Sequence, residues 1–366
     1  MKKKVFSIII SIIIFSLTYF LFGIWGIFEI NKHHDILFKS EKNLIFHKKY
    51  SKKIHHLRDS NRWNKKDNEH LFSIVNESKD YKKILLFQGD SWIEQISENL
   101  LSESMLKKFS NTKKLNTINA GITSFAPSLM NIQYKILKND FNISPNILII
   151  YVDQTDIGDE VCRYAKNKMY SNLGEFKFVK NEKYSRSQFD YTKIYEYSEL
   201  YLKNNKLNTI LKFPYIKLRY FFLRNKILMT SIISNGWKNR NNYKCTFYQI
   251  QKELLNFNKK SKKIFQKSLN EYLIFLKEEK KLEKILVVTF PHKKHHKNTY
   301  KVNISNYIDD IITNLDDKRF SHLNFSMMNF SKDLIDNMYQ KDHASHLKND
   351  YHAKIFLKEI LSKLEK

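Results

Sequence analysis

Residues 84–91 read Ile-Leu-Leu-Phe-Gln-Gly-Asp-Ser, an apolar run that stops at Gly89-Asp90-Ser91. A short apolar run bounded by a turn signal is typical of a strand that is buried on both faces of a parallel sheet. Near the C-terminus, the stretch Asp342-His343-Ala344-Ser345-His346-Leu347 precedes a last predicted helix. A serine that ends a buried strand, a histidine and a nearby aspartate are the nucleophile, the base and the orienting carboxylate that serine catalysis requires.

Strands and helices are predicted to alternate after residue 81. Further apolar runs lie at 115–118, 147–152, 285–290 and, more weakly, 323–328. Helices are predicted at 91–108, 128–141, 307–315 and 351–366, together with a stretch that carries Phe265, Leu269, Tyr272 and Leu276 on one stripe. This order predicts an α/β fold, a three-layer α/β/α sandwich with a parallel, flavodoxin-like sheet of about five strands. Right-handed crossovers place the carboxyl ends of these strands at one edge, where sites form.

One part of the predicted domain, which spans residues 81–366, breaks this alternation. Residues 163–250 contain no clear strand–helix unit and are rich in Tyr, Phe, Lys and Asn. We expect a mostly helical insertion near the site edge, with a lid as one role. Residues 215–224 mix four aromatic or leucine side chains with Lys217, Arg219 and Arg224. Packing of this segment onto the domain is favoured over a position on a membrane surface.

The N-terminal residues predict a membrane anchor. Three lysines at positions 2–4 precede an apolar stretch from Val5 to Phe28, which is long enough to span a bilayer as a helix. No small-residue cleavage site follows, which favours an uncleaved, single-pass anchor over a signal peptide. The leading lysines favour a cytoplasmic N-terminus, although more lysines follow the stretch. We therefore expect residues 1–30 to anchor the chain, residues 31–80 to form a juxtamembrane stalk, and the domain to be periplasmic.

The composition limits the classes of binding partner that we expect. The chain has 366 residues and a net charge of +27. The lysines are scattered, and their abundance alongside Asn and Ile fits an AT-rich genome as well as an anionic partner. No nucleic-acid-binding motif is present, so we expect no nucleic-acid partner. Attraction of the basic chain to anionic lipid or an acidic glycan stays open. The sequence carries no signal for an oligomeric state.

No cofactor is predicted. Cys162 and Cys245 lack metal-ligand spacing, and two buried thiols are favoured over a disulfide. His292, His295 and His296 follow the fourth predicted strand without carboxylates at ligand spacing, which favours a basic, solvated loop over a metal site. Neither a metal nor an organic cofactor is therefore implied.

At four places the chain resembles the SGNH, or GDSL, hydrolases, over about residues 81–366 without the insertion. Gly89-Asp90-Ser91 is similar to the block that holds the nucleophile, and Asn119-Ala120-Gly121 to the block whose glycine donates a backbone N–H to the oxyanion. Asp153-Gln154-Thr155-Asp156 stands where the family has Gly-x-Asn-Asp, and residues 342–346 stand where it has Asp-x-x-His. The resemblance implies the following roles: nucleophile Ser91, base His346, orienting group Asp342, oxyanion donors Gly121 and Thr155, and substrate contacts Asp90 and Asp156.

Two departures bear on catalysis. Thr155 replaces the usual asparagine, and its hydroxyl is a shorter donor. The spacing from Asp342 to His346 is one residue longer than usual, so a backbone carbonyl is an alternative orienting group. The stretch from Asp153 to Glu160 resembles the third block of membrane-anchored members associated with surface polysaccharides. The resemblance thus implies an esterase or O-acyltransferase acting on a glycan or another acylated small molecule. The alternative is a catalytically impaired glycan-binding or assembly factor at the membrane.

Each motif also has a structural interpretation. Ser91 with Glu94 three residues later matches a capping box, and Gly89 and Gly121 match ordinary strand-end turns. His346 matches a solvated residue at a helix start. For Asp156, Asp159 and Glu160, a sugar contact and an acidic first turn of a helix stay equally open. The four blocks in order at successive strand ends favour the catalytic interpretation.

Overall fold

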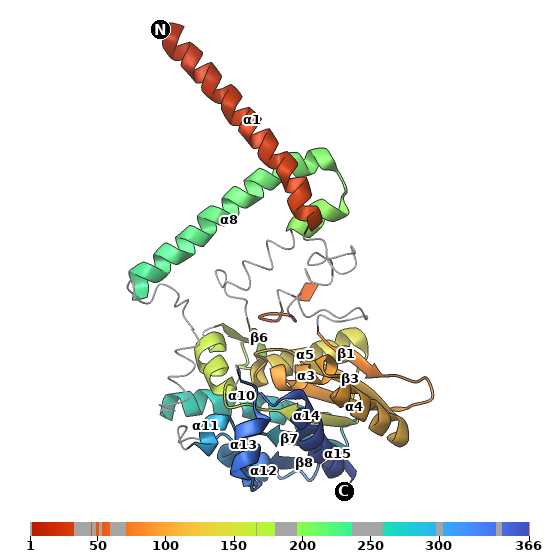
Figure 1. Cartoon of the computed structure of the whole chain (residues 1–366). Coiled ribbons are helices and arrows are strands. Elements are labelled where there is room, and N and C mark those ends of the chain that lie inside the picture. The colour runs from red at the N-terminus through yellow and green to blue at the C-terminus, as the bar shows by residue number, and fades with distance from the viewer. Residues whose placement is uncertain are drawn as a thin grey trace. The chain divides into compact units, whose positions relative to one another are not determined.

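The computed structural model describes residues 2–32, 45, 49–50, 53–58, 71–165, 167–179, 196–235, 259–297, 303–341 and 346–365. The chain divides into two compact units (Figure 1). One unit comprises Met1–Arg62 and Asn181–Lys244, and the other comprises Trp63–Lys180 and Cys245–Lys366. The second unit holds the sheet and the order of strands and helices expected from the sequence, so we call it the α/β unit; the first is the helical unit.

A six-stranded sheet forms the centre of the α/β unit. Its order is β1-β3-β2-β4-β7-β8, and only the edge strand β1 runs antiparallel to its neighbour. The strands are β1 (Ser73–Asn76), β2 (Lys83–Gly89), β3 (Leu115–Gly121), β4 (Ile147–Tyr151), β7 (Lys284–Thr289) and β8 (Phe320–Asn324). The five parallel strands follow the flavodoxin-like order 2-1-3-4-5, which confirms the predicted fold class. Strand β1 was not expected, and it lies within the segment predicted to be a stalk.

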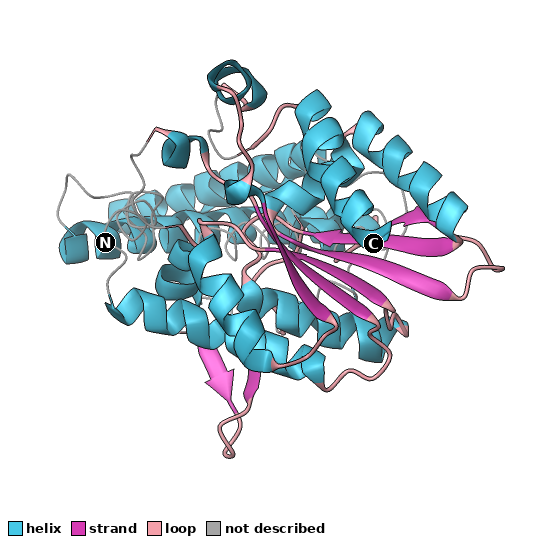
Figure 2. Cartoon of the chain, turned by 90° about the horizontal axis from the view of Figure 1, so that it is seen from below, coloured by secondary structure: helices cyan, strands magenta, loops and turns pink. Residues whose placement is uncertain are grey.

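Helices cover both faces of this sheet (Figure 2). They are α3 (Ser91–Glu98), α4 (Leu100–Lys113), α5 (Pro127–Phe141), α6 (Asp156–Gly158), α10 (Lys259–Lys277), α11 (Lys293–His296), α12 (Ser305–Leu315), α13 (Lys332–Met338), α14 (Asn349–Tyr351) and α15 (Lys358–Glu365), with π-helical turns η2 (Asp159–Tyr164) and η5 (His352–Leu357). Successive residues of a strand point to opposite faces. Leu85 and Phe87 pack in one core with Trp92 of α3, while Gln88 accepts a hydrogen bond from Tyr272 of α10. Both faces of β2 are therefore buried, as its apolar run predicts.

Three local features differ from the expectation. The helix predicted at 91–108 is two helices, because the Asn99 side chain accepts the N–H groups of Leu101 and Ser102 and starts α4. The fifth strand ends at Asn324, and the buried Phe325 begins a 3₁₀ turn. The insertion contains a hairpin, β5 (Lys168–Tyr170) and β6 (Phe176–Val179). These strands are too short for a period-two pattern to reveal them.

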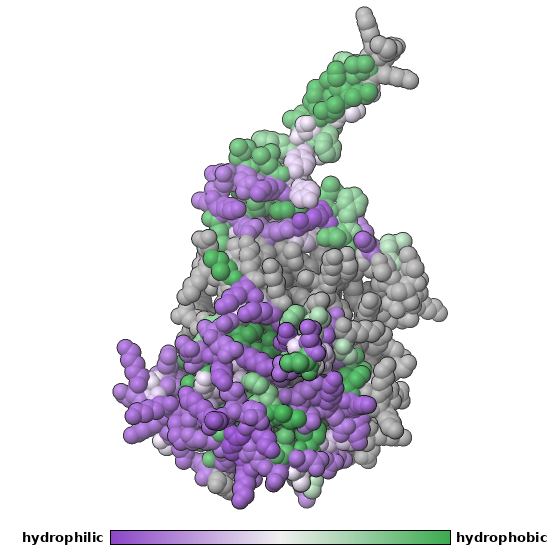
Figure 3. Space-filling view, turned by 180° about the vertical axis from the view of Figure 1, so that it is seen from behind, coloured by the Kyte–Doolittle hydropathy of each residue, from purple (hydrophilic) through white to green (hydrophobic). Residues whose placement is uncertain are grey.

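The helical unit contains α1 (Lys2–Lys32), a short helix at 196–202 and α8 (Lys206–Asn235). Residues 5–31 of α1 include an 18-residue window with a mean hydropathy of 2.5 and are long and apolar enough to cross a membrane; this part of the helix is mostly green in Figure 3. A buried cluster joins the three helices: Ile30, Tyr197, Leu200, Phe213, Ile216 and Tyr220. One stripe of α8 packs against α1, and packing of residues 215–224 onto the α/β domain stays a prediction.

Candidate functional site

Ser91 is placed by the end of β2 and the start of α3. Asp90 is the N-cap of α3, and its Oδ1 accepts the N–H of Trp92 at 2.9 Å. Ser91 is therefore the first helical residue and not the N-cap, so the capping-box interpretation was wrong. The Glu94 carboxylate instead accepts the N–H and hydroxyl of Thr123, at 3.0 and 2.5 Å. Because Asp90 caps the helix, the Ser91 hydroxyl does not have to.

The Ser91 hydroxyl contacts His346. Ser91 Oγ lies 2.7 Å from His346 Nε2, and both residues are half-buried. The His346 carbonyl accepts the N–H of Gln340 at 2.9 Å, and the next residue, Leu347, forms an isolated β-bridge with Tyr339. These backbone contacts hold the segment that carries the imidazole beside the nucleophile. The structure thus brings the predicted nucleophile and base into direct hydrogen-bond contact.

The orienting aspartate cannot be placed in the same way. Asp342 belongs to residues 342–345, which lie outside the described residues. Its role stays a prediction. The described residues do show a ring contact to the His346 imidazole. The Trp92 indole meets the His346 ring edge-on, with centroids 6.0 Å apart and an interplanar angle of 85°.

Gly121 ends β3 beside the backbone of α3. A Cβ atom there would lie 2.3 Å from Glu94 N and 2.5 Å from the Ile93 carbonyl carbon, so only glycine fits this approach. The Gly121 N–H donates to Asn119 Oδ1 at 2.9 Å. Asn119 Nδ2 in turn donates to the Ile93 carbonyl at 2.9 Å and to Ser97 Oγ at 2.7 Å. Asn119 therefore ties α3 to β3, and the Gly121 N–H would have to share or leave this bond to reach an oxyanion.

Thr155 lies in a tight turn after β4. Its N–H donates to Asp153 Oδ1 at 2.7 Å. The Asp153 N–H donates to Asp156 Oδ2 at 3.0 Å. The Thr155 side chain is half-buried. These bonds fix the backbone of the turn, and the role of the Thr155 hydroxyl as an oxyanion donor stays a prediction.

Buried carboxyl groups surround this turn. Burial and the nearby Asp153 raise the pKa of Asp90 well above its usual range, and burial and Asp90 do the same to the pKa of Asp156. Burial raises the pKa of Asp159 to about 6, against the lowering effect of Arg163. Desolvation and mutual repulsion favour the neutral form of a carboxyl group. Burial and mutual repulsion thus favour the neutral forms of these carboxyl groups, which lessens the negative charge that would oppose an oxyanion.

The predicted substrate contacts, Asp90 and Asp156, are both buried. Each accepts a backbone N–H within the turn it belongs to. Their contact with a substrate stays a prediction. The two neighbouring acids have internal partners: Asp159 pairs with Arg163 at 3.1 Å, and Glu160 accepts the N–H and hydroxyl of Ser128 at 2.8 Å each. These contacts favour the structural interpretation for Asp159 and Glu160.

The histidines after β7 form local hydrogen bonds. His292 Nδ1 accepts the N–H of Lys294 at 3.1 Å and caps α11, His295 Nδ1 accepts the N–H of His292 at 2.9 Å, and His296 Nε2 lies 3.1 Å from the Tyr339 hydroxyl. Within the described ranges, no group of three or more His, Cys, Asp or Glu residues is arranged to hold a metal ion. The Cys162 side chain and all of Cys245 lie outside those ranges.

Two residues of the site were missed in the sequence. Trp92 stacks on Tyr151 with centroids 5.1 Å apart and forms the wall behind His346. Asn119 was quoted only as part of a motif, yet it fixes the position of α3. The signal for Trp92 was its place directly after Ser91, where a large apolar residue of a first helical turn must face the core.

No protein-family model and no curated protein matches the sequence. Among solved structures, the chain is similar to an acetyl xylan esterase, Est2A, from the rumen bacterium Butyrivibrio proteoclasticus, with a TM-score of 0.33 and 9% sequence identity. The similarity covers 79% of this chain and 66% of that esterase, so it spans slightly less than two thirds of the esterase's length. A similarity of this size does not by itself assign an activity.

Proposed function

We propose that this chain is a serine-dependent hydrolase or O-acyltransferase of the SGNH type, which acts on a carbohydrate or glycan ester through an acyl-enzyme. The observation that carries the proposal is the 2.7 Å contact between Ser91 Oγ and His346 Nε2. Ser91 follows β2, and the chain runs from β2 to β3 on one side and then to β4 on the other. Ligands of open α/β sheets bind at such a switch point, outside the carboxyl ends of the strands.

The proposed reaction has two halves. Ser91 Oγ attacks the ester carbonyl carbon as His346 Nε2 takes the hydroxyl proton, which forms a tetrahedral oxyanion. The carbon–oxygen bond to the alcohol then breaks, and His346 gives its proton to the leaving oxygen. In the second half, water or an acceptor hydroxyl attacks the acyl-serine by the same proton transfers. Water completes hydrolysis, and a sugar hydroxyl completes transfer.

The oxyanion would be held at the N-terminus of α3. Ser91 is the first helical residue, so its N–H has no partner within the helix, and the helix dipole favours negative charge there. Gly121 and Thr155 are the further proposed donors, and the Gly121 N–H would share or leave its present bond to Asn119 Oδ1. Raised carboxyl pKa values nearby support this arrangement, because neutral carboxyl groups repel an oxyanion less.

The glycan substrate is proposed from the resemblance of residues 153–160 to polysaccharide-associated members of the SGNH hydrolases. The proposed location is the membrane, with α1 as a single-pass anchor and the α/β unit in the periplasm. A reporter that is active only outside the cytoplasm, fused after Lys366, tests this topology. Activity is expected, and a stable but inactive fusion would reverse the assignment.

A second candidate function is a glycan-binding or assembly factor without catalysis. The observation that favours it is the engagement of the Gly121 N–H by Asn119 Oδ1. A binding protein needs no reactive serine, so covalent labelling separates the two candidates.

The experiment uses a fluorescent serine-directed phosphonate with the full chain in detergent. Labelling of the wild type is expected, and it should be absent from Ser91→Ala. The matched control is Ser102→Ala, because Ser102 Oγ lies 2.9 Å from Nδ1 of the buried His352. That pair has the same chemistry but is enclosed, so its loss should leave labelling intact. Wild-type protein that stays unlabelled, or labelling that survives in folded Ser91→Ala, contradicts the proposal.

A further inference from the structure

The N-terminal part of α8 crosses α1 at very short range. A Cβ atom on Gly23 would lie 2.2 Å from the Ile210 carbonyl oxygen, and one on Gly26 would lie 2.3 Å from the Phe213 ring. The Tyr19 hydroxyl donates to the Leu211 carbonyl at 2.6 Å. Small residues at a helix crossing allow the two backbones to approach, as they do within membranes. This contact sits in the last third of the apolar stretch of α1.

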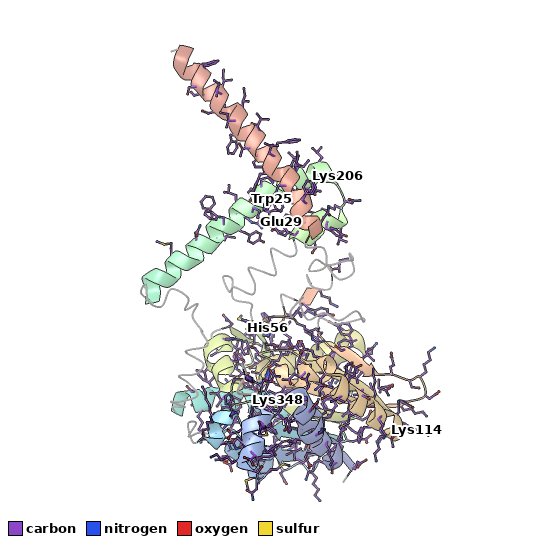
Figure 4. All side chains as sticks on the ribbon, in the orientation of Figure 1. Trp25, Glu29, His56, Lys114, Lys206 and Lys348 are labelled. Carbon is purple, nitrogen blue, oxygen red and sulfur yellow. The ribbon has the colours of Figure 1, made fainter. Side chains whose placement is uncertain are left out.

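Aromatic and charged residues mark the level of this crossing. Lys217 Nζ lies 5.2 Å from the Trp25 ring centroid and 3.3 Å from Glu29 Oε1. Trp25 and Glu29 lie where α1 meets α8 (Figure 4). Tryptophan and charged side chains are enriched where a membrane helix leaves the hydrocarbon for the headgroups. The crossing therefore falls at the level expected for a membrane–water interface.

A second apolar stripe of α8 lies on the side away from the buried cluster of the helical unit. The buried residues at 209, 213, 216 and 220 recur every three or four positions, and they face the rest of the helical unit. About half a turn away lies another stripe, in which each side chain is more than half exposed: Leu207, Leu211, Tyr215, Leu218, Phe221, Phe222 and Met229. The buried stripe accounts for the packing of α8 within the helical unit. The exposed apolar stripe therefore indicates contact with a second apolar environment.

The charge of α8 has one sign. Its sequence carries Lys206, Lys212, Lys217, Arg219, Arg224 and Lys226, and it contains no Asp or Glu. By helical periodicity these positions flank the exposed apolar stripe on both sides. Lys217 and Arg219 pair with Glu29 and Glu196 within the helical unit, whereas the Lys206 and Lys212 side chains are exposed. Long basic side chains can keep their stems in apolar surroundings while the charges reach lipid phosphates.

We propose that α8 is an in-plane helix at the membrane surface, whose exposed apolar stripe contacts lipid and whose exposed Lys206 and Lys212 bind anionic headgroups. The occupant is lipid because α8 packs against α1, which is long and apolar enough to cross a membrane, and in Figure 1 α8 crosses α1 at a steep angle instead of running beside it. The inference rests on α1 being the membrane anchor proposed above. It makes α8 a second contact that orients the protein on the bilayer.

The test places single cysteines in the full chain, with Cys162 and Cys245 replaced by Ser. An environment-sensitive fluorophore is attached at Phe15→Cys on α1, at Leu218→Cys on the exposed stripe, or at Lys212→Cys on a flank of α8. The protein is reconstituted in phosphatidylcholine vesicles with phosphatidylglycerol and doxyl-labelled lipid. Quenching at position 218 should approach that at position 15 and exceed that at position 212 by about twofold or more, because only the apolar stripe lies among acyl chains.

The outcomes separate this inference from the anchor itself. Strong quenching at position 15 with equal, weak quenching at 218 and 212 would overturn the placement of α8 and leave the anchor intact. No quenching at position 15 or 218 would overturn the anchor and, with it, this inference.

A charge variant tests the headgroup contact. Lys206→Gln with Lys212→Gln should remove most of the extra quenching at position 218 that phosphatidylglycerol produces, since each basic residue near an anionic surface contributes about 1 kcal/mol. Lys280→Gln with Lys281→Gln removes the same charge from the α/β unit and should change nothing. Equal effects of the two variants would contradict a specific contact between α8 and anionic lipid.

Discussion

Ser91 Oγ lies 2.7 Å from His346 Nε2, although the two residues are 255 positions apart in the chain. Ser91 follows β2 at the carboxyl edge of the sheet, and His346 follows α13 in a segment bonded to Met338 and Gln340. At this distance a proton passes directly from the hydroxyl to the imidazole. The pair is the part of the site on which the proposed chemistry depends.

We predict that Ser91→Ala and His346→Ala each remove nearly all esterase activity, and that the double variant is little worse than either single one. Residues that act as one unit lose their common effect only once, and the loss is on the order of 10⁶-fold in serine proteases. The measurement is hydrolysis of a small chromogenic acetate ester by the full chain. Additive losses would show that the two side chains act independently.

Stability should be unchanged in Ser91→Ala, because Asp90 and not Ser91 caps α3. Thermal melting is the control, and Asp90→Ala is the matched variant. It should lower the free energy of unfolding by about 1 kcal/mol through loss of the cap. A large drop in the melting temperature of Ser91→Ala would mean that its activity loss reports on folding.

Asp342→Asn should lower the turnover number less than Ser91→Ala does. The longer spacing between Asp342 and His346 allows a backbone carbonyl to orient the imidazole instead. Steady-state rates with the same ester decide the matter. A loss of about 10⁴-fold, as in proteases whose buried aspartate holds the imidazole, would assign the orienting role to Asp342.

Thr155→Val should keep the fold and slow the reaction by about a hundredfold or more, since one oxyanion donor typically contributes that much. The variant removes the hydroxyl and keeps the shape of the side chain. Thr155→Ser is the control, because it retains the donor. Equal rates for Thr155→Val and the wild type would mean that backbone N–H groups alone bind the oxyanion.

Gly121→Ala should both destabilise the α/β unit and reduce activity. The added methyl would lie 2.3 Å from Glu94 N, so α3 has to move away from β3. Such overpacking costs about 1–3 kcal/mol. Gly174→Ala is the control, because it strains a backbone of φ +80° in open space away from α3. It should reduce stability but leave the turnover number unchanged, whereas an unaltered Gly121→Ala enzyme would contradict the close contact.

Buried His352 should make the protein less stable as the pH falls from about 6.5 to about 4. Burial lowers its pKa to about 4, so the unfolded chain binds a proton in this window and the folded chain does not. Its Nε2 donates to the Trp92 carbonyl at 3.0 Å, and Nδ1 accepts from Ser102. The difference amounts to about 3 kcal/mol at most.

His352→Gln should reduce this loss, because an amide offers both a donor and an acceptor without titrating. Urea unfolding at pH 7, 5.5 and 4 measures it. Asp159 acts in the opposite direction, since its raised pKa of about 6 makes the folded state bind a proton first, and stability from this group is lost as the pH rises through 6. The comparison of His352→Gln with the wild type cancels that contribution. Parallel pH dependences of the two proteins would refute the role of His352.

Local sequence patterns determined much of the architecture. The apolar runs predicted four of the five parallel strands, and the fifth run, 323–328, overlaps only the last two residues of β8. The stripe of Phe265, Leu269, Tyr272 and Leu276 is fully buried along α10. Both signals depend on residues that are neighbours in the chain and must face the same core, so they can be read without knowing the fold. The same holds for α1, whose length and hydropathy are local properties.

Only the tertiary structure decided which partner each polar group has. From the sequence, the cap of α3 could involve Ser91, Asp90 or Glu94. In the structure Asp90 caps the helix, and Glu94 is engaged by Thr123, which follows β3 in the chain. The Gly121 N–H donates to Asn119 Oδ1, and a stripe of α8 packs against α1. In each case the alternative contacts involve segments far apart in the chain. The free energies of these alternatives differ by only a few kcal/mol, so no local pattern encodes the outcome.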